Sequence, residues 1–546
     1  MADATYDVVI VGGGSRALAL MMYLTKFNPG ISAACFEERH ELGTGWSCEE
    51  SPAAGFVADT HSFQHSPDWY FTPIWEDIPE FKEYGGDYYQ ATAANGCAFS
   101  EDDSCLLLYG TWCDPNGERT AKEIARFSER DAETWLRLTE KRNKYWRPAW
   151  LEWAWNPPAP LGQQDALDRL LFNPDSGIDP RWLLMNPIEA VRDVFEAIET
   201  QIFLLRPVQS WGLDLLTGSG LGAIITIFTM AYAYGRGKGG QHTFAHAAHR
   251  VVHNNGGKTF TQHKVDKILV ENGRAKGIRL ADGTEVKARM CVVNTAEPGA
   301  LCHDLLGPDH VPREIMRKVD NIMDHLTCIT WYTWALHEPP RWKVASFNPD
   351  VQDCLWLALG DKDIWRIIEE QCNRWERRMY RRLTIVAAPC NDPTTFPPGK
   401  AMILTEQYVP PAYMYTEEEW KQFEKKHAED VIEELHKYAP NITWDTVIGY
   451  NPITPLATSR DAPGSYRKAG NWSVIDHIPI QFGRTRPFPE LADFRLSALG
   501  IRNFYTGGAG WHPLASGGPC QGYIAYKCIA EDFGLKKPWE EKGRPF

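Results

Sequence analysis

The chain lacks the cysteine spacing on which zinc sites, iron–sulfur clusters and disulfide frameworks depend. Its 13 cysteines are scattered along 546 residues, and no two of them form a C-x-x-C pair. An odd number of separated thiols is typical of a protein kept in a reducing compartment. We therefore expect a cytoplasmic protein without a metal site.

Clusters of basic residues are also absent. The sequence has 57 Lys and Arg against 71 Asp and Glu, a formal net charge of −14, and no run of five basic residues. Such a chain is a poor partner for nucleic acid, whose phosphates are bound by clustered Lys and Arg. The sequence has neither a G-x-S-x-G motif nor a P-loop, so these nucleophile and nucleotide-hydrolysis sites are excluded.

Long apolar runs are scarce. Residues 213–234 are mostly apolar over a length that could span a bilayer, but they include Asp214 and three glycines. We interpret this stretch as a buried helix or as a helix that lines a substrate tunnel. A helix that docks one-sidedly on a membrane is the alternative, so a peripheral membrane contact stays open.

The start of the chain carries a strand, a glycine turn and a helix in sequence. Residues 6–11 predict a strand buried on both faces, and Gly12-x-Gly14-x-x-Ala17 follows it. Gly12 permits a tight turn, Gly14 lets the backbone approach a pyrophosphate, and Ala17 lets helix and strand pack closely. The amino end of this helix, at Ser15 and Arg16, offers free N–H groups to phosphates.

A second strand is expected over residues 31–36, and it ends at Glu37. A carboxylate at this place accepts hydrogen bonds from a ribose diol, so the whole pattern predicts a bound dinucleotide. A small-residue loop, Gly43-Thr44-Gly45-Trp46, follows soon after. Such a loop favours a buried flavin over a nicotinamide cofactor.

The middle of the chain differs in composition. The sequence has 22 Trp and 12% aromatic residues, and the stretch from 68 to 235 is rich in Trp, Tyr and Pro, which suits an apolar substrate cavity. Apolar spacing predicts one long helix over 117–146, ended by the Trp and Pro cluster at 145–158. A charged helix over 416–438 is expected to open at Thr416.

At these motifs the chain resembles the carotenoid desaturase (phytoene dehydrogenase-like) family of FAD-dependent oxidoreductases. The acidic pair and arginine, Glu37-Glu38-Arg39, precede a Gly43-Thr44 doublet whose second glycine is replaced, and Gly55 to His61 is similar to the segment that lies beside the flavin in that family. Residues 235–294 resemble the family's middle region, in which the position of Val265 meets the adenine. Gly508 to Pro513, with Gly517 and Gly518, resembles its closing segment, although Trp511 replaces a small residue.

The resemblance implies an α/β fold, mixed with α+β features, built around a Rossmann-type FAD-binding domain that is discontinuous in sequence. Residues 1–67, 236–300 and 481–546 are expected to form this domain, and residues 68–235 and 301–480 the inserted substrate-binding or cap domain. The residues expected to bind FAD are Gly12, Gly14, Ser15, Arg16, Ala17, Glu37, Glu38, Arg39, Gly43, Thr44, Gly45, Trp46, Asp59, Val265, Asn294, Gly508, Ala509, Gly517 and Gly518.

The activity implied is removal of a hydride from an activated, allylic C–H bond of an apolar isoprenoid, with a small monoterpene within range. His512, His61 and Asp59 are the candidate catalytic residues, although a loop-orienting role for His512 is favoured over a catalytic one. A polyene isomerase or saturase and a catalytically silent flavin-binding subunit of a heteromeric dehydrogenase remain as alternatives. The electron acceptor, whether quinone, carrier protein or oxygen, and the choice between a homodimer and a heterodimer stay open.

Overall fold

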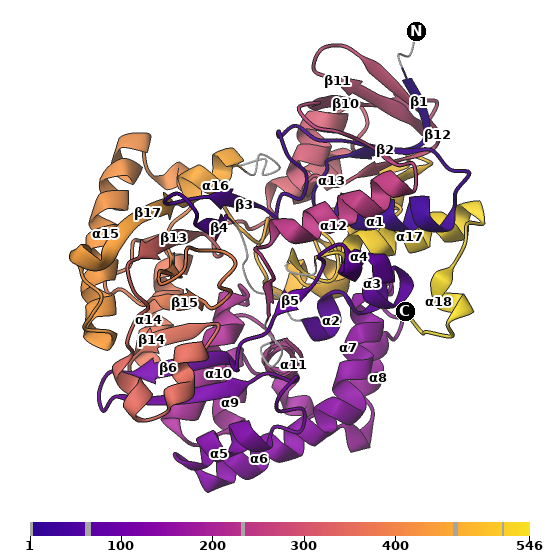
Figure 1. Ribbon diagram of the computed structural model, residues 1–546. Helices are drawn as coiled ribbons and strands as arrows, with labels where there is room; N and C mark the ends of the chain where they lie inside the picture. Colours follow the sequence, from indigo (N-terminus) through magenta and orange to yellow (C-terminus); the bar gives the residue numbers. More distant parts are fainter. Residues whose placement is uncertain (1–3, 61–66, 231–234, 462–467, 516–517) are drawn as a thin grey trace.

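The computed structural model describes residues 4–60, 67–230, 235–461, 468–515 and 518–546. Two large β-sheets organise these residues, one at the upper right of Figure 1 and one at its left. Helices surround both sheets, and a separate helical region occupies the bottom of the view. The fold is mixed α/β, as expected from the sequence.

The first sheet has seven strands in the order β10-β11-β12-β1-β2-β9, and β18 pairs with β12. β1 is parallel to both of its neighbours, and β18 is parallel to β12, whereas β10, β11 and β12 form antiparallel hairpins. The strands are β1 (Ala4–Val11), β2 (Ala33–Phe36), β9 (Lys258–Phe260), β10 (Val265–Glu271), β11 (Arg274–Leu280), β12 (Glu285–Asn294) and β18 (Phe504–Thr506).

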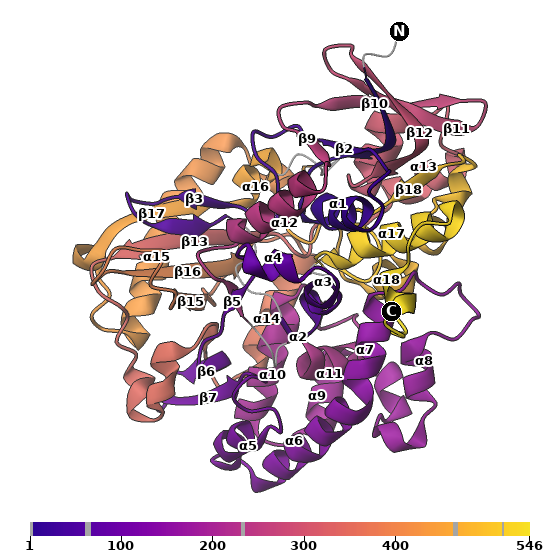
Figure 2. The same cartoon turned by 45° about the vertical axis from the view of Figure 1, so that its right-hand side comes forward.

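Three helices pack together beside this sheet. They are α1 (Ser15–Phe27), α12 (His242–Asn254) and α17 (Cys520–Phe533), and α1 contacts both of the others. Figure 2 shows α1 between α12 and α17 although α1 and α17 come from opposite ends of the chain. Gly522 permits this packing, because a Cβ there would lie 2.1 Å from the carbonyl oxygen of Arg16.

The second sheet also has seven strands, in the order β17-β13-β16-β15-β14-β6-β7. Its strands come from two separate parts of the chain, and β14 joins them through a parallel pairing with β6. The strands are β6 (Ala93–Phe99), β7 (Ser104–Tyr109), β13 (Ile329–Leu336), β14 (Leu357–Gly360), β15 (Val386–Cys390), β16 (Ala401–Tyr408) and β17 (Val447–Ile453).

Side chains of β13 alternate between the two faces of the second sheet. Tyr332 and Trp334 pack in a cluster with residues of α15 (Glu417–Tyr438), whereas Trp331 belongs to the main core shared with the first sheet. The predicted start of α15 is confirmed, because Thr416 and Glu419 cap it reciprocally. The face that carries Trp331 is therefore the one turned toward the first sheet.

All strands of the first sheet fall within residues 1–67, 236–300 and 481–546, and all strands of the second fall within 68–235 and 301–480. The proposed division of the chain thus separates the two large sheets. One small sheet crosses it, since β5 (Tyr88–Tyr89) pairs with β8 (Arg236–Gly237).

The single helix predicted over 117–146 is wrong. The structure has α5 (Glu118–Ala125) and α6 (Glu129–Lys141), separated where Ser128 accepts a hydrogen bond from the Asp131 N–H and starts a new helix. The Trp and Pro cluster does not end the helical region either. A π-helical turn leads into α7 (Arg147–Ala154), and Pro148 occupies the first turn of α7, where a missing N–H costs nothing.

The apolar stretch at 213–234 contains α11 (Gly220–Thr229), whose residues from Ala223 onward are buried. Its interpretation as a buried helix is confirmed for the described residues; residues 231–234 lie outside them. Among the described residues, no helix is both long and apolar enough to cross a membrane.

Candidate cofactor-binding site

One elongated cavity of about 360 Å³ runs from the first sheet to the second. It begins at the ends of β1 and β2 and at Val265 on β10, and it reaches Trp331 on β13. Segments from both ends of the chain and from its middle line it, so the cavity forms only in the folded protein.

The glycine turn after β1 forms one wall of the cavity. Gly12 has a φ of +93°, and a Cβ there would lie 2.4 Å from the Oγ1 of Thr295. Gly14 caps α1 without a side-chain hydrogen bond, and no acidic residue stands in the first turn of the helix. The amino end of α1 therefore presents its positive pole to the cavity, as a pyrophosphate site requires.

Glu37 holds the glycine turn in place. Its Oε2 accepts the Gly13 N–H at 2.7 Å and its Oε1 accepts the Arg39 N–H at 2.9 Å. The side chain also lines the cavity, and the residue is only 8% exposed. Glu37 thus fixes the turn and places a buried carboxylate where a ribose would lie.

The loop after Glu37 closes over the amino end of α1. Gly43 donates its N–H to the Gly13 carbonyl at 3.0 Å, and Ser15 donates its N–H to the Gly43 carbonyl at 3.0 Å. Gly43 has a φ of +110°, and a Cβ there would lie 2.8 Å from Ala245 on α12. The loop places Thr44 against the cavity beside the glycine turn.

Two arginines tie the carboxyl-terminal part of the chain to the cavity. Arg16 donates to the carbonyl of Ala515, and both residues line the cavity. Arg486 is fully buried and donates to the carbonyls of Ala509 at 3.0 Å and Ser473 at 2.9 Å. Burial lowers the pKa of Arg486 to about 9, but the guanidinium stays charged at neutral pH.

Aromatic and uncharged groups form the end of the cavity nearest the second sheet. Trp331 of β13 and Trp472 line it, together with Asn471 and Val474. Asp476 positions this loop, since its carboxylate accepts the Asn471 amide N–H at 2.7 Å and also binds backbone N–H groups of residues 325–327. An apolar molecule would meet indole surfaces here, with one amide and one hydroxyl, that of Thr458, nearby.

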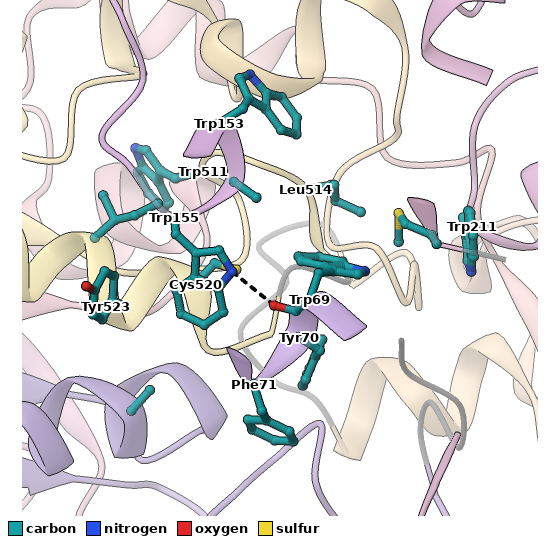
Figure 3. Packing of buried hydrophobic residues seen from close by; sticks show 14 of the residues in the cluster. Trp69, Tyr70, Phe71, Trp153, Trp155, Trp211, Trp511, Leu514, Cys520 and Tyr523 are labelled. Atoms are coloured by element: carbon teal, nitrogen blue, oxygen red, sulfur yellow. Dashed lines mark hydrogen bonds between the residues drawn. The ribbon is translucent and has the colours of Figure 1, made fainter. Parts of the chain in front are cut away.

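A cluster of aromatic side chains packs where the helical region meets the carboxyl-terminal segment (Figure 3). Trp155 donates its indole N–H to the Trp69 carbonyl at 3.0 Å, which joins the end of α7 to the segment that carries Tyr70. Tyr70 in turn lines the cavity and accepts the Trp46 indole N–H at 3.3 Å. The Trp-rich region therefore buttresses the cavity wall.

Most residues expected to bind the cofactor lie on this one cavity. Those that line it are Gly12, Gly14, Ser15, Arg16, Glu37, Glu38, Arg39, Thr44, Gly45, Trp46, Val265 and Ala509. Five others shape the cavity from behind. Ala17 is buried in α1, Gly43 closes the loop, Asn294 bonds the backbone of Ala296, Gly508 packs on the same turn, and Gly518 packs on the Tyr70 ring. Gly517 lies outside the described residues.

The three candidate catalytic residues are not brought together on the cavity. Asp59 pairs with Arg236 at 2.7 Å and accepts the Gln241 N–H at 2.8 Å, which fixes the entry into α12. His512 is fully buried, its Nε2 lies 2.8 Å from the Trp153 carbonyl, and burial lowers its pKa to about 4. This geometry favours the loop-orienting role for His512. His61 lies outside the described residues.

Several cavity residues carry no local motif and were missed by sequence reasoning. They reach the site through loops or strand pairings distant in sequence, and they are Tyr70, Lys264, Thr295, Ala296, Glu297, Ala300, Asp304, Leu305, Trp331, Thr458, Asn471, Trp472, Val474 and Ala515. The one signal that pointed toward them is the abundance of Trp, which predicted an aromatic cavity but not its members.

No family model matches the chain, but curated proteins do over its full length. A limonene dehydrogenase subunit of Castellaniella defragrans is 22% identical over 565 residues, which cover 98% of this chain and 96% of that protein. The pyridine nucleotide-disulfide oxidoreductase domain-containing protein 2 of Mus musculus is 25% identical and covers 93% and 90%. A neurosporene-forming phytoene desaturase of Cereibacter sphaeroides is 26% identical over about half of each chain.

Solved structures share the fold over nearly the whole chain. An oxidoreductase from Methanosarcina mazei superposes with a TM-score of 0.59 at 15% identity and covers 95% of this chain and 99% of its own. Cyclohexylamine oxidase from Brevibacterium oxydans gives a TM-score of 0.55 at 14% identity, with 97% and 99% covered.

The chain is therefore a distant homologue of the phytoene desaturase-like FAD-dependent oxidoreductases and has the fold of the amine-oxidase flavoproteins. It is an enzyme of the oxidoreductase class. The residues present fit FAD, because the glycine turn, the open amino end of α1 and the Glu37 carboxylate line a single cavity.

Proposed function

We propose that this enzyme binds FAD in the cavity between the two sheets and removes a hydride from an activated C–H bond of an apolar terpene. The supporting observation is the change in character along the cavity. The end next to β1 and β2 offers glycines, a helix terminus and carboxylates, whereas the described cavity residues contributed between 331 and 474 are uncharged. When bound, FAD supplies the two-electron chemistry.

The residues of the chain bind, orient and exclude water. Glu37 is placed to accept hydrogen bonds from a ribose, and the amino end of α1 faces a pyrophosphate. Trp331 and Trp472 would hold an apolar substrate by burying its surface, and their π-faces stabilise positive charge that develops on an allylic carbon. The similarity to the limonene dehydrogenase subunit supports a substrate as small as a monoterpene.

Anaerobic mixing with candidate substrates tests this proposal. The purified holoenzyme is mixed with a cyclic monoterpene such as limonene, with a long polyene such as phytoene, and with cyclohexylamine, while flavin absorbance is followed. Bleaching by the monoterpene, and none by the amine, is the expected result, because an ammonium group would be stranded without a carboxylate among the described cavity residues from 331 to 474. Bleaching by the amine alone would contradict the proposal.

Trp331→Phe sharpens the test. Shortening this side chain enlarges the substrate end without touching the glycine turn, so the preference between monoterpene and polyene should move toward the larger molecule while flavin content stays unchanged. Phe423→Leu, on α15 beyond the opposite face of the sheet, is the control and should leave the preference unaltered.

A second function is favoured by the full-length relative, which is itself a component of a dehydrogenase with more than one kind of chain. In this alternative the present chain is a flavin-binding partner that supports a sequence-related active chain. Terpene oxidation that appears only after co-expression with such a partner would favour it, and turnover by this chain alone would exclude it.

A further inference from the structure

A cluster of buried polar side chains lies against the second sheet, outside the main cavity. Glu406 projects from β16, while Arg206, Gln209 and Ser210 come from α10 (Ile198–Ser210), and Glu370 from α14 (Ile364–Trp375). All five are less than a tenth exposed. No motif accounts for them, and the dinucleotide site does not use them.

Glu406 stands next to the substrate end of the main cavity. It is the register partner of Trp331 in the antiparallel pairing of β13 with β16. Opposed residues in such a pairing project from the same face with Cβ atoms about 5 Å apart. Since Trp331 lines the main cavity, Glu406 is one side chain removed from it.

The charges around Glu406 leave it without a counter-ion among the described residues. Arg206 is held by Glu370 at 2.7 Å, so its charge is already compensated. Arg374 on α14 stacks over the Tyr408 ring at 4.0 Å, and the Cys97 thiol lies on β6 with its pKa raised by burial. Burial, and to a smaller extent the charge of Glu370, raise the pKa of Glu406 to about 8.

Two small cavities connect Glu406 with the surface. Each has a volume of about 10 Å³, close to what one water molecule needs. They share Glu370, Thr384 and Tyr408 as walls; one reaches the exposed Arg378 and Arg382, and the other reaches Glu406.

Unpartnered donors point to water in these spaces. Both terminal nitrogens of Arg374, the amide nitrogen of Gln209 and the hydroxyl of Ser210 are buried and have no hydrogen-bond partner in the described part of the chain. Arg374 lines the outer cavity, and Gln209 and Ser210 line the inner one. Buried donors of this kind are costly unless water satisfies them.

We propose that Glu406 is a proton-binding site of this enzyme, which exchanges its proton with solvent through the two small cavities and serves the substrate end of the main cavity. The inference rests on the proposed function. Removal of two hydrogens from an apolar substrate yields one hydride, taken up by the cofactor chemistry, and one proton. A C–H bond breaks, an O–H bond forms at Glu406, and the proton then passes to water in the small cavities and on to solvent.

Infrared spectroscopy tests the site without turnover. In the substrate-free holoenzyme, titrated through the neutral and alkaline range, a protonated carboxyl C=O band should disappear with a midpoint near 8. The band should be missing in Glu406→Gln and retained in Glu424→Gln, a carboxyl of α15 whose pKa burial also raises. A band unchanged in Glu406→Gln overturns the proposal.

The exchange route is tested in a chain that keeps Glu406. Thr384→Ile fills the wall shared by the two small cavities and should slow deuterium exchange of the Glu406 carboxyl several-fold, whereas Thr384→Ser should not. Exchange at the wild-type rate in Thr384→Ile contradicts the route. This arm also decides the matter should Glu406→Gln fail to fold.

The flavin spectrum of the same samples separates the two claims. A preparation that shows the Glu406 titration but takes up no FAD supports the proton site and contradicts the proposed function. A preparation that holds FAD but has no titrating buried carboxyl contradicts the proton site alone. With substrate, the dehydrogenation rate should rise with pH through about 8, and Glu406→Gln should abolish this limb while Glu424→Gln preserves it.

Discussion

The two large sheets face the same cavity but recognise what it holds in different ways. The first sheet contributes backbone: a turn with a left-handed glycine, an uncapped helix end and one carboxylate that fixes the turn. The second contributes side chains, with Trp331 on the cavity and Glu406 behind it. Backbone recognition suits a cofactor that must not change, and side-chain recognition suits a substrate that differs between relatives.

The largest expected effect breaks the backbone side of this comparison. Gly12→Val places a β-branched side chain at a φ of +93° and against the Thr295 hydroxyl. It should weaken FAD binding by more than about tenfold through backbone strain and overlap. Flavin content after purification measures the loss. Gly30→Val is the matched control, because a Cβ at Gly30 meets no atom within 4 Å.

Removing the charge of Glu37 should have a smaller effect on the same side. Glu37→Gln keeps the size of the side chain but weakens its bonds to the Gly13 N–H and to the ribose. We expect about tenfold weaker FAD binding, in line with the value of a hydrogen bond to a charged group. Calorimetric titration of the apoprotein measures it. Glu38→Gln is the control, since the Glu38 carboxylate is paired with Lys264 at the surface; an equal loss in both variants would assign the effect to general charge.

On the side-chain half, stability should respond to pH through Glu406. Its pKa is raised in the folded state, so between the ordinary glutamate pKa and about 8 the folded protein binds one more proton than the unfolded chain. Stability from this group is complete below the unfolded pKa and is lost as pH rises, by up to about 1.4 kcal/mol per pH unit. Denaturant unfolding at several pH values should show this slope in the wild type and a flatter one in Glu406→Gln; identical slopes would refute it.

The smallest effect separates fold stability from cofactor binding. Thr416→Ala removes the cap of α15, on the far face of the second sheet, and should cost about 1 kcal/mol of stability. Flavin affinity should not change, because the second sheet contributes to the cavity only through its other face. Denaturant unfolding and FAD titration of the same variant check both halves of this statement. A loss of FAD affinity would show that the two sheets are more tightly coupled than proposed.

The sequence predicted what depends on local patterns. The turn from Gly12 to Ala17, the carboxylate of Glu37 and the hairpin at Val265 are short motifs whose geometry follows from neighbouring residues. Trp331 and Glu406 could not be predicted as neighbours, because their contact depends on the pairing of strands 75 residues apart in the chain. The break in the 117–146 helix was missed because Ser128 fits a helical pattern but acts as a cap.

The visible spectrum of the purified protein tests the central claim most directly. We predict a bound flavin that is lost in Gly12→Val, retained in Gly30→Val, and bleached when a monoterpene is added to the wild-type protein without oxygen. A protein that carries no flavin, and takes up none when FAD is supplied, would contradict the account.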